Sequence, residues 1–278
     1  MISAARRAAL ARLRQRLEKI ERPQWLKESA VGAPVDHDGA LPRLGAVRGA
    51  LSEVRAADWR DGPAALAFAL ALAGRRAAET SKTTSKAIVF LALAHEARRG
   101  GHLFGRALAA CEVNLDSLVA AFATDAKALL WAMEEAARAD GVAAVVADIP
   151  GAHRLLDLTA TRRLSLAAGF SGAAAILVRT MKAPEPTAAD IRWRVAHAPS
   201  APALHDRRAS GNPRWTVEIE RCRKGGRGAW VVEQRHDGLL VCGPARPVPE
   251  FVAAALADRP PEAAPFLGPR YAGARRSL

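Results

Sequence analysis

The stretch from Lys86 to Leu93, Lys-Ala-Ile-Val-Phe-Leu-Ala-Leu, decides the fold class of this chain. Its apolar residues follow one another without the alternation of a half-exposed strand, which is typical of a strand buried on both faces. Strands of that kind occur where helices cover both sides of a parallel sheet. We therefore expect an α/β domain around this run.

Similar strands and helices alternate on both sides of that stretch. Further strands are expected at 50–54, 115–122, 142–149 and 173–178, and helices at 64–73, 103–110, 125–141 and 159–168. Thr124 and Asp125 are suitable residues for the start of the third of these helices. Such alternation predicts a mostly parallel central sheet.

The pattern changes after Pro186. Segments 191–195, 214–219 and 228–233 alternate apolar and polar residues with a period of two, and Gly225-Gly226 would join the last two as a hairpin. We interpret these segments as antiparallel strands added at the edge of the sheet.

The two ends of the chain differ from the core in composition. We assign residues 1–30 to a basic amphipathic helix, 31–48 to a linker, 49–242 to the α/β core, and 243–278 to a Pro-rich tail. Each end carries apolar residues that add little to the core, so we interpret them as partner-binding residues. They are Leu10, Leu13, Leu17 and Ile20 in the helix, and Phe251, Val252 and Leu256 in the tail.

The composition favours an anionic partner. The 278 residues carry 41 Lys and Arg against 28 Asp and Glu, a net charge of +13. A genome rich in G and C, which raises Ala and Arg together, is an alternative source of part of this charge. The three cysteines form no CxxC pair, and no apolar run approaches the ~18–20 residues of a membrane span. We expect a cytoplasmic protein with no membrane partner and no disulfide framework.

The second half of the core is also basic. Ten Lys and Arg residues lie between positions 192 and 235, against four acids. A predicted hairpin tip is the first choice for contact with single-stranded DNA; its cations are Arg221, Arg223, Lys224 and Arg227. Trp193, Trp215 and Trp230 could stack on bases, but their place on alternating strands favours a position in the core.

Several phrases, in this order, resemble the core of the RecA recombinases over roughly residues 45–235. They include Phe-Gly-Arg-Ala-Leu at 104–108, Asn-Leu-Asp-Ser-Leu at 114–118, Asp-Ala-Lys-Ala-Leu at 125–129, and the strand that ends in Asp148. The phrases at 94–105, 125–131, 192–195 and 213–215 resemble more closely the ImuA family. That family comprises RecA-like accessory proteins of bacterial DNA-damage mutagenesis cassettes.

The chain departs from RecA at the phosphate-binding loop. Aligned from Gly49 and Glu53, the two loop glycines fall on Ala56 and Asp61, the lysine on Gly62, and the Ser or Thr on Pro63. A P-loop needs its glycines for backbone N–H contacts, its lysine for the β- and γ-phosphates, and its hydroxyl for magnesium. We therefore expect no nucleotide cofactor and interpret Asp148, the residual magnesium-linked acid, as inherited or as a cap.

No other pattern indicates a catalytic or metal site. His95-Glu96 lacks the second histidine of a zinc-protease motif, because position 99 is Arg99. No carboxylate or cysteine completes a ligand set with His95 and His102, and no serine lies in a G-x-S-x-G turn. We expect no enzyme activity and no bound metal.

The resemblance implies a non-catalytic RecA-like adaptor of the SOS response that supports translesion DNA synthesis. Its implied partners are an ImuB-type polymerase paralogue and an error-prone relative of the replicative polymerase subunit, with RecA and single-stranded DNA as further expected contacts. Two alternatives stay open. One is a DNA-dependent ATPase or recombinase-like protein with an atypical nucleotide site, and the other is a cell-division checkpoint inhibitor.

Overall fold

The computed structural model describes residues 48–245, apart from residues 82–85, 102, 112, 152, 181–184, 204–205, 207–208, 224–226 and 236–237. The expected N-terminal helix at 1–30 and the linker up to residue 47 lie outside these residues. The tail from residue 246 lies outside them too. The same holds for the predicted partner-binding residues Leu10, Leu13, Leu17, Ile20, Phe251, Val252 and Leu256, which stay predictions.

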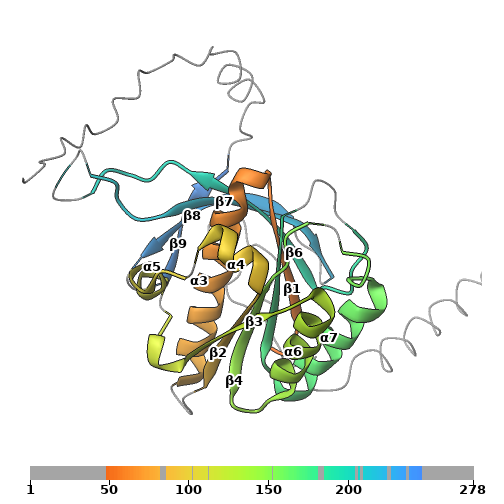
Figure 1. The fold of residues 1–278 in the computed structure, drawn as a ribbon. Coiled ribbons are helices and arrows are strands. Elements are labelled where there is room, and N and C mark those ends of the chain that lie inside the picture. The colour runs from red at the N-terminus through yellow and green to blue at the C-terminus, as the bar shows by residue number, and fades with distance from the viewer. Residues whose placement is uncertain are drawn as a thin grey trace, which may run out of the picture. The chain divides into compact units, whose positions relative to one another are not determined.

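The described residues form one nine-stranded sheet, in the order β3-β2-β4-β5-β1-β6-β7-β8-β9 (Figure 1). Its strands are β1 (Leu51–Ala56), β2 (Ala87–Leu93), β3 (Leu118–Ala123), β4 (Val142–Asp148), β5 (Ala174–Arg179), β6 (Ile191–Ala198), β7 (Arg214–Cys222), β8 (Gly228–Arg235) and β9 (Gly238–Pro244). Neighbours from β3 to β6 pair in parallel, and neighbours from β6 to β9 pair antiparallel. The predicted fold class, an α/β core with a mostly parallel sheet and added antiparallel strands, is confirmed.

Helices cover both faces of the parallel part of the sheet (Figure 1). Helix α3 (Gly62–Ser81) packs with Val54 and Val146 on one face, while α6 (Ala126–Arg138) and α7 (Leu158–Ser171) pack with Leu51 and Val145 on the other. Successive residues of one strand thus enter two different cores, which is why the strand sequences are apolar without alternation. None of the helices in the described residues is both long and apolar enough to span a membrane.

Local capping sets the ends of α6 and α7. The carboxylate of Asp125 accepts the N–H of Ala128 at 2.8 Å, which confirms the predicted start of α6. Asp157 does the same for α7 through the N–H of Ala160 at 2.7 Å. Helix α7 ends at Ser171 and is capped by Gly172, whose φ of 77° is a left-handed conformation that a side chain would strain.

An aromatic cluster lies between α3 and the second half of the sheet. Phe68 of α3 is fully buried, and its ring packs edge-on against Trp193 of β6 and Trp215 of β7, with centroids 5.8 Å apart in both pairs. These two tryptophans therefore lie in the core, as their alternation predicts, and are not open to a nucleobase. Trp230 of β8 packs against the same cluster and is partly buried.

A buried ion pair joins the parallel and antiparallel parts of the sheet. Glu53 of β1 and Arg192 of β6 are register partners, and the guanidinium lies 2.8 Å from the carboxylate. The hydroxyl of Thr187 donates to the same carboxylate at 2.8 Å, and Arg192 also donates to the carbonyl of Glu185 at 2.6 Å. These hydrogen bonds offset part of the cost of removing two charges from water.

Helix α3 is longer than the expected helix at 64–73, and α4 (Ala94–Gly100) was not expected. Three further elements also differ from their expected form. Strand β6 is antiparallel to β7, as expected, but lies parallel to β1 on its other side, because the chain crosses over after β5 before β6 joins the sheet. Strand β9 extends to Pro244, two residues beyond the expected end of the core, although its sequence alternates only weakly. Residues Leu115–Ser117 form a 3₁₀ turn, with the Asn114 side chain as its cap, so β3 begins later than expected.

Replacing Phe68 by alanine tests the aromatic cluster. Because the ring is fully buried between α3 and two strands, Phe68→Ala should lower the free energy of unfolding by about 3–5 kcal/mol. Urea titration followed by circular dichroism measures the change. The matched control is Phe170→Ala, since Phe170 is 82% exposed and its loss should stay within about 0.5 kcal/mol.

Candidate functional site

The predicted remnants of the phosphate loop lie together at the junction of β1 and α3. Strand β1 ends at Ala56, the 3₁₀ turn η1 covers Trp59–Asp61, and α3 starts at Gly62. The Asp58 carboxylate accepts the N–H of Arg60 at 3.1 Å, and the Asp61 carboxylate accepts the N–H of Asp58 at 3.2 Å. This reciprocal capping box closes the turn with the chain's own carboxylates.

Asp61 also joins this turn to β6. Its Oδ1 accepts the backbone N–H of His197 at 2.9 Å and lies 2.5 Å from Nδ1 of the His197 ring. The carboxylate is almost entirely buried, while the imidazole is 77% exposed. A phosphate here would lie beside the Asp61 carboxylate and be repelled by it. The backbone N–H groups of Asp58 and His197 already donate to that carboxylate.

Gly62 and Pro63 stand where a P-loop has its lysine and hydroxyl. A Cβ at Gly62 would lie 3.2 Å from Oγ1 of Thr180, the residue after β5, so the segment after β5 leaves little room for a side chain. Pro63 supplies neither a hydroxyl nor an N–H. The junction therefore lacks both the lysine and the hydroxyl with which a P-loop binds a triphosphate and its magnesium.

Two carboxylates lie near one another at the ends of adjacent strands. Asp148 ends β4 and pairs in register with Ala92 of β2, and Glu96 lies in the first turn of α4 (Ala94–Gly100), directly after β2. Burial raises the pKa of Asp148 to about 6, and the negative charge of Glu96 adds to the rise. Glu96 is itself within 3.2 Å of His95 and 3.9 Å of Arg99. Within the described ranges, no group of three or more His, Cys, Asp or Glu side chains could hold a metal ion.

The basic hairpin differs from a set of free cations. Arg221 donates to the carbonyl of Thr187 at 2.9 Å, and the Arg223 guanidinium lies 3.9 Å from the carboxylate of Asp190. Both side chains therefore help to hold the segment that leads into β6. Arg227 is exposed, and Lys224 lies outside the described residues. The prediction of a DNA contact stays a prediction, and Arg227 is its best-placed described residue.

Sequence reasoning missed the partners of two buried acids. Glu53 and Arg192 carry opposite charges at expected strand positions, so a pairing of those strands could have been inferred from the sequence. No local signal joins Asp61 to His197, because 136 residues separate them.

Comparison with known proteins identifies relatives of this chain. It is 32% identical over 213 residues to Protein ImuA of Caulobacter vibrioides strain NA1000 / CB15N. The aligned region covers 72% of this chain and 81% of that protein. Protein ImuA of a second strain, ATCC 19089 / CIP 103742 / CB 15, matches equally. The chain belongs to the ImuA family. No family model matches the chain. Its assignment to the ImuA family therefore depends on these two relatives, and it agrees with the resemblance of the sequence phrases.

The β1–α3 junction of this ImuA-family chain should not support nucleotide turnover. We expect no ATP hydrolysis above background, with or without single-stranded DNA, because Gly62 and Pro63 stand in place of the lysine and the hydroxyl. A coupled-enzyme assay measures turnover, and Glu96→Gln and Asp148→Asn are the matched controls. ATP hydrolysis that either substitution abolishes would show that the expectation is wrong.

The raised pKa of Asp148 predicts a pH-dependent stability. The folded chain keeps this proton up to about pH 6, whereas the unfolded chain releases it near the ordinary value of 3.8. The contribution of Asp148 is therefore most favourable at low pH and is lost as pH rises through this window. Between pH 5 and pH 8 the wild type should lose about 1–2 kcal/mol relative to Asp148→Asn, measured by urea unfolding at both pH values. Parallel stability curves would mean that the pKa of Asp148 is not raised.

Proposed function

We propose that this ImuA-family chain is a non-catalytic RecA-like adaptor in DNA-damage-induced mutagenesis. It would support translesion synthesis by an ImuB-type polymerase paralogue and an error-prone relative of the replicative polymerase subunit. The observation that carries this proposal is the β1–α3 junction, where Asp61 and His197 bind each other at the place of a phosphate loop. A core that keeps the RecA-like layers but lacks the P-loop lysine and hydroxyl is suited to binding proteins.

Among the described residues no further strand lies beside β3, and this sheet edge supports the adaptor role. Strand β3 is the first strand of the sheet and reads Leu-Val-Ala-Ala-Phe-Ala, with no charged residue. Val119 and Phe122 are 52% and 42% exposed. Natural edge strands usually carry charges or proline that prevent pairing with another chain. An uncharged edge of this kind fits strand addition by a neighbouring protein, for which RecA is the expected candidate.

One observation keeps the ATPase alternative in view. Asp148 and Glu96 retain two acids at the ends of β4 and β2, and the pKa of Asp148 is raised to about 6. Buried acids with shifted pKa values also occur in inactive proteins. Since Gly62 and Pro63 stand in place of the P-loop lysine and hydroxyl, we favour the adaptor. No described residue bears on the checkpoint-inhibitor alternative.

The tail provides the direct test of the adaptor role. A chain that stops after Ala245 keeps the whole of β9, which ends at Pro244, so its melting temperature should stay within about 2 °C of the full chain. The same truncation should abolish binding to the ImuB-type partner in a pull-down and abolish damage-induced mutagenesis in cells. In the full chain, Phe251→Ser with Leu256→Ser should have the same effect, which would assign the loss of binding to these two side chains. Full-strength binding by the truncated chain would exclude the tail from partner recognition.

Direct contact with DNA should be weak and non-specific in sequence. With a net charge of +13, affinity for single-stranded DNA should fall steeply with salt, and Arg227→Glu should reduce the salt slope by about one. Fluorescence anisotropy at several salt concentrations measures both. The control is Arg99→Glu, since Arg99 is 80% exposed on α4, away from the hairpin. An equal effect of both substitutions would mean that no DNA site is centred on Arg227.

A further inference from the structure

An exposed tryptophan stands in the turn between β1 and α3. Trp59 opens the 3₁₀ turn η1 and is 71% exposed. The guanidinium of Arg60 lies over its indole, 4.9 Å from the ring centroid. A cation over the face of a tryptophan is attracted by the quadrupole of the ring. The two side chains therefore present a planar stack to solvent.

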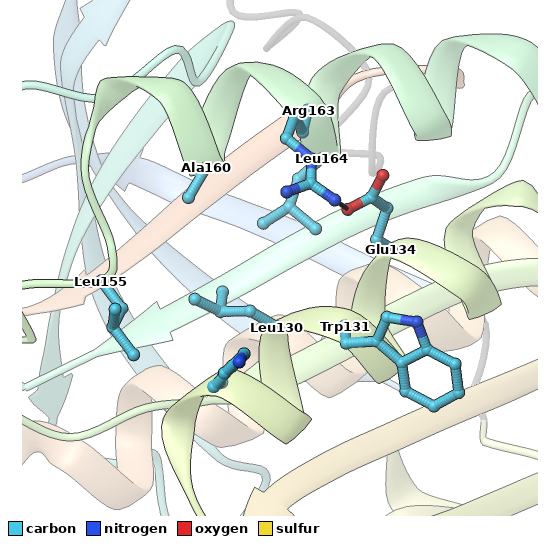
Figure 2. A pocket seen from close by; sticks show the side chains of 8 residues that line it. Leu130, Trp131, Glu134, Leu155, Ala160, Arg163 and Leu164 are labelled. Carbon is cyan, nitrogen blue, oxygen red and sulfur yellow. Dashed lines mark hydrogen bonds and ion pairs between the residues drawn. The ribbon is translucent and has the colours of Figure 1, made fainter.

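Trp131 of α6 is an exposed tryptophan in apolar surroundings and serves as the comparison. It is 64% exposed and borders a groove of about 280 Å³ between α6 and α7 (Figure 2). Three leucines and two cations at the rim line this groove with it: Leu130, Leu155, Leu164, Lys127 and Arg163. An aromatic residue beside an apolar groove is typical of a protein-binding surface.

Trp59 has polar surroundings instead. Its neighbours in the turn are Asp58 and Arg60, and the ring of His197 borders the turn through its contact with Asp61. The exposed aromatic face is therefore edged by polar and charged groups. A flat aromatic surface with a cation stacked on it suits a planar, polar ligand that also stacks, and a nucleobase is such a ligand.

The turn is held in place before any ligand binds. The carboxylates of Asp58 and Asp61 accept N–H groups within the turn, and Asp61 also accepts the N–H of His197 on β6 at 2.9 Å. Asp61 is almost entirely buried, whereas Trp59 and Arg60 are exposed. The repelling carboxylate thus faces the protein and the stacked pair faces solvent. A stacking surface on a fixed turn loses little conformational entropy on binding.

The turn is distant from the basic hairpin. His197, beside the turn, pairs with Trp215 near the start of β7, whereas Cys222 ends that strand and leads into the hairpin that carries Arg227. Seven residue steps separate Trp215 from Cys222, which is roughly 24 Å at about 3.4 Å per residue. A contact at Trp59 would therefore be separate from one at Arg227.

We propose that Trp59, with Arg60 stacked on it, is a base-stacking site for single-stranded nucleic acid. A base lies on the face of the indole that Arg60 leaves open, and the strand follows the solvent side of η1, away from Asp61. The net charge of +13 attracts the strand without regard to sequence, and the stack then adds affinity that depends little on salt. The inference rests on the proposed function only in naming nucleic acid as a ligand.

Fluorinated tryptophan locates the bound strand on the full chain. The six tryptophans are replaced by 5-fluorotryptophan, and Trp59→Phe and Trp131→Phe assign two of the ¹⁹F resonances. An oligo(dT) of about 20 nucleotides, longer than most single binding sites, is titrated at low salt. The Trp59 resonance should shift, and that of Trp131 should stay. An unmoved Trp59 resonance when the DNA is bound, or an equal shift of Trp131, would overturn the proposal.

Substitutions at Trp59 separate stacking from charge. In fluorescence anisotropy at several salt concentrations, Trp59→Ala should bind oligo(dT) about tenfold more weakly with an unchanged salt slope. Trp59→Phe should retain most of the affinity, because its ring still stacks. The matched control is Trp131→Ala, which should leave the affinity unchanged.

An abasic oligonucleotide of the same length keeps the phosphates but offers no base to stack. The wild type and Trp59→Ala should therefore bind it equally, which would also show that the variant is folded. Equal losses of Trp59→Ala on the abasic strand and on oligo(dT), or no loss on either, would overturn the proposal.

These readouts need neither the polymerase partner nor the tail. If oligo(dT) binds without any response at Trp59, this site is wrong, while the adaptor role and the prediction for Arg227 stand. If no oligo(dT) binds at low salt, both nucleic-acid contacts are wrong. The pull-down and the mutagenesis assay still decide the adaptor role in either case.

Discussion

The buried ion pair of Glu53 and Arg192 determines how the two parts of the sheet meet. Strand β1 is the parallel neighbour of β6, and the two charges face each other in register at 2.8 Å. Buried charges need further polar partners, and here Thr187 donates to Oε2 of Glu53 while Arg192 donates to the Glu185 carbonyl; Oε1 of Glu53 is buried without a hydrogen-bond partner. The pair thus selects one register for β6, because a slip would leave both charges unpaired in the core.

The register of β6 in turn decides the chemistry of the candidate site. It brings the N–H and the ring of His197 to Asp61, at the end of β1 where a phosphate loop would lie. The Asp61 carboxylate repels phosphates and already accepts the N–H groups of Asp58 and His197. The junction therefore acts as a structural link between the start of α3 and β6. The second acid, Asp148, keeps its place at the end of β4, where burial and the charge of Glu96 raise its pKa. This combination favours a scaffold over an ATPase.

Much of the parallel half could be predicted because burial on both faces imposes a simple pattern. The runs around Ile88, Val145 and Ile176 are apolar throughout, since each residue enters one of two cores. The antiparallel half was harder to predict. The alternation at 191–195 predicts a strand, but it carries no information on whether the neighbour is parallel, and β9 has too weak an alternation to be recognised. The sequence also gave no sign that Arg221 and Arg223, in the predicted DNA contact, bind the segment before β6.

The sequence by itself determined the α/β class, the core position of Trp193 and Trp215, and the absence of a lysine and a hydroxyl after β1. These properties follow from residue type and local periodicity, which do not depend on distant partners. Only the tertiary structure decided what Asp61 binds and that α6 and α7 leave an apolar groove with a cationic rim. Both features need residues far apart in the chain to meet. Such contacts depend on strand register and helix packing, which a single sequence does not specify locally.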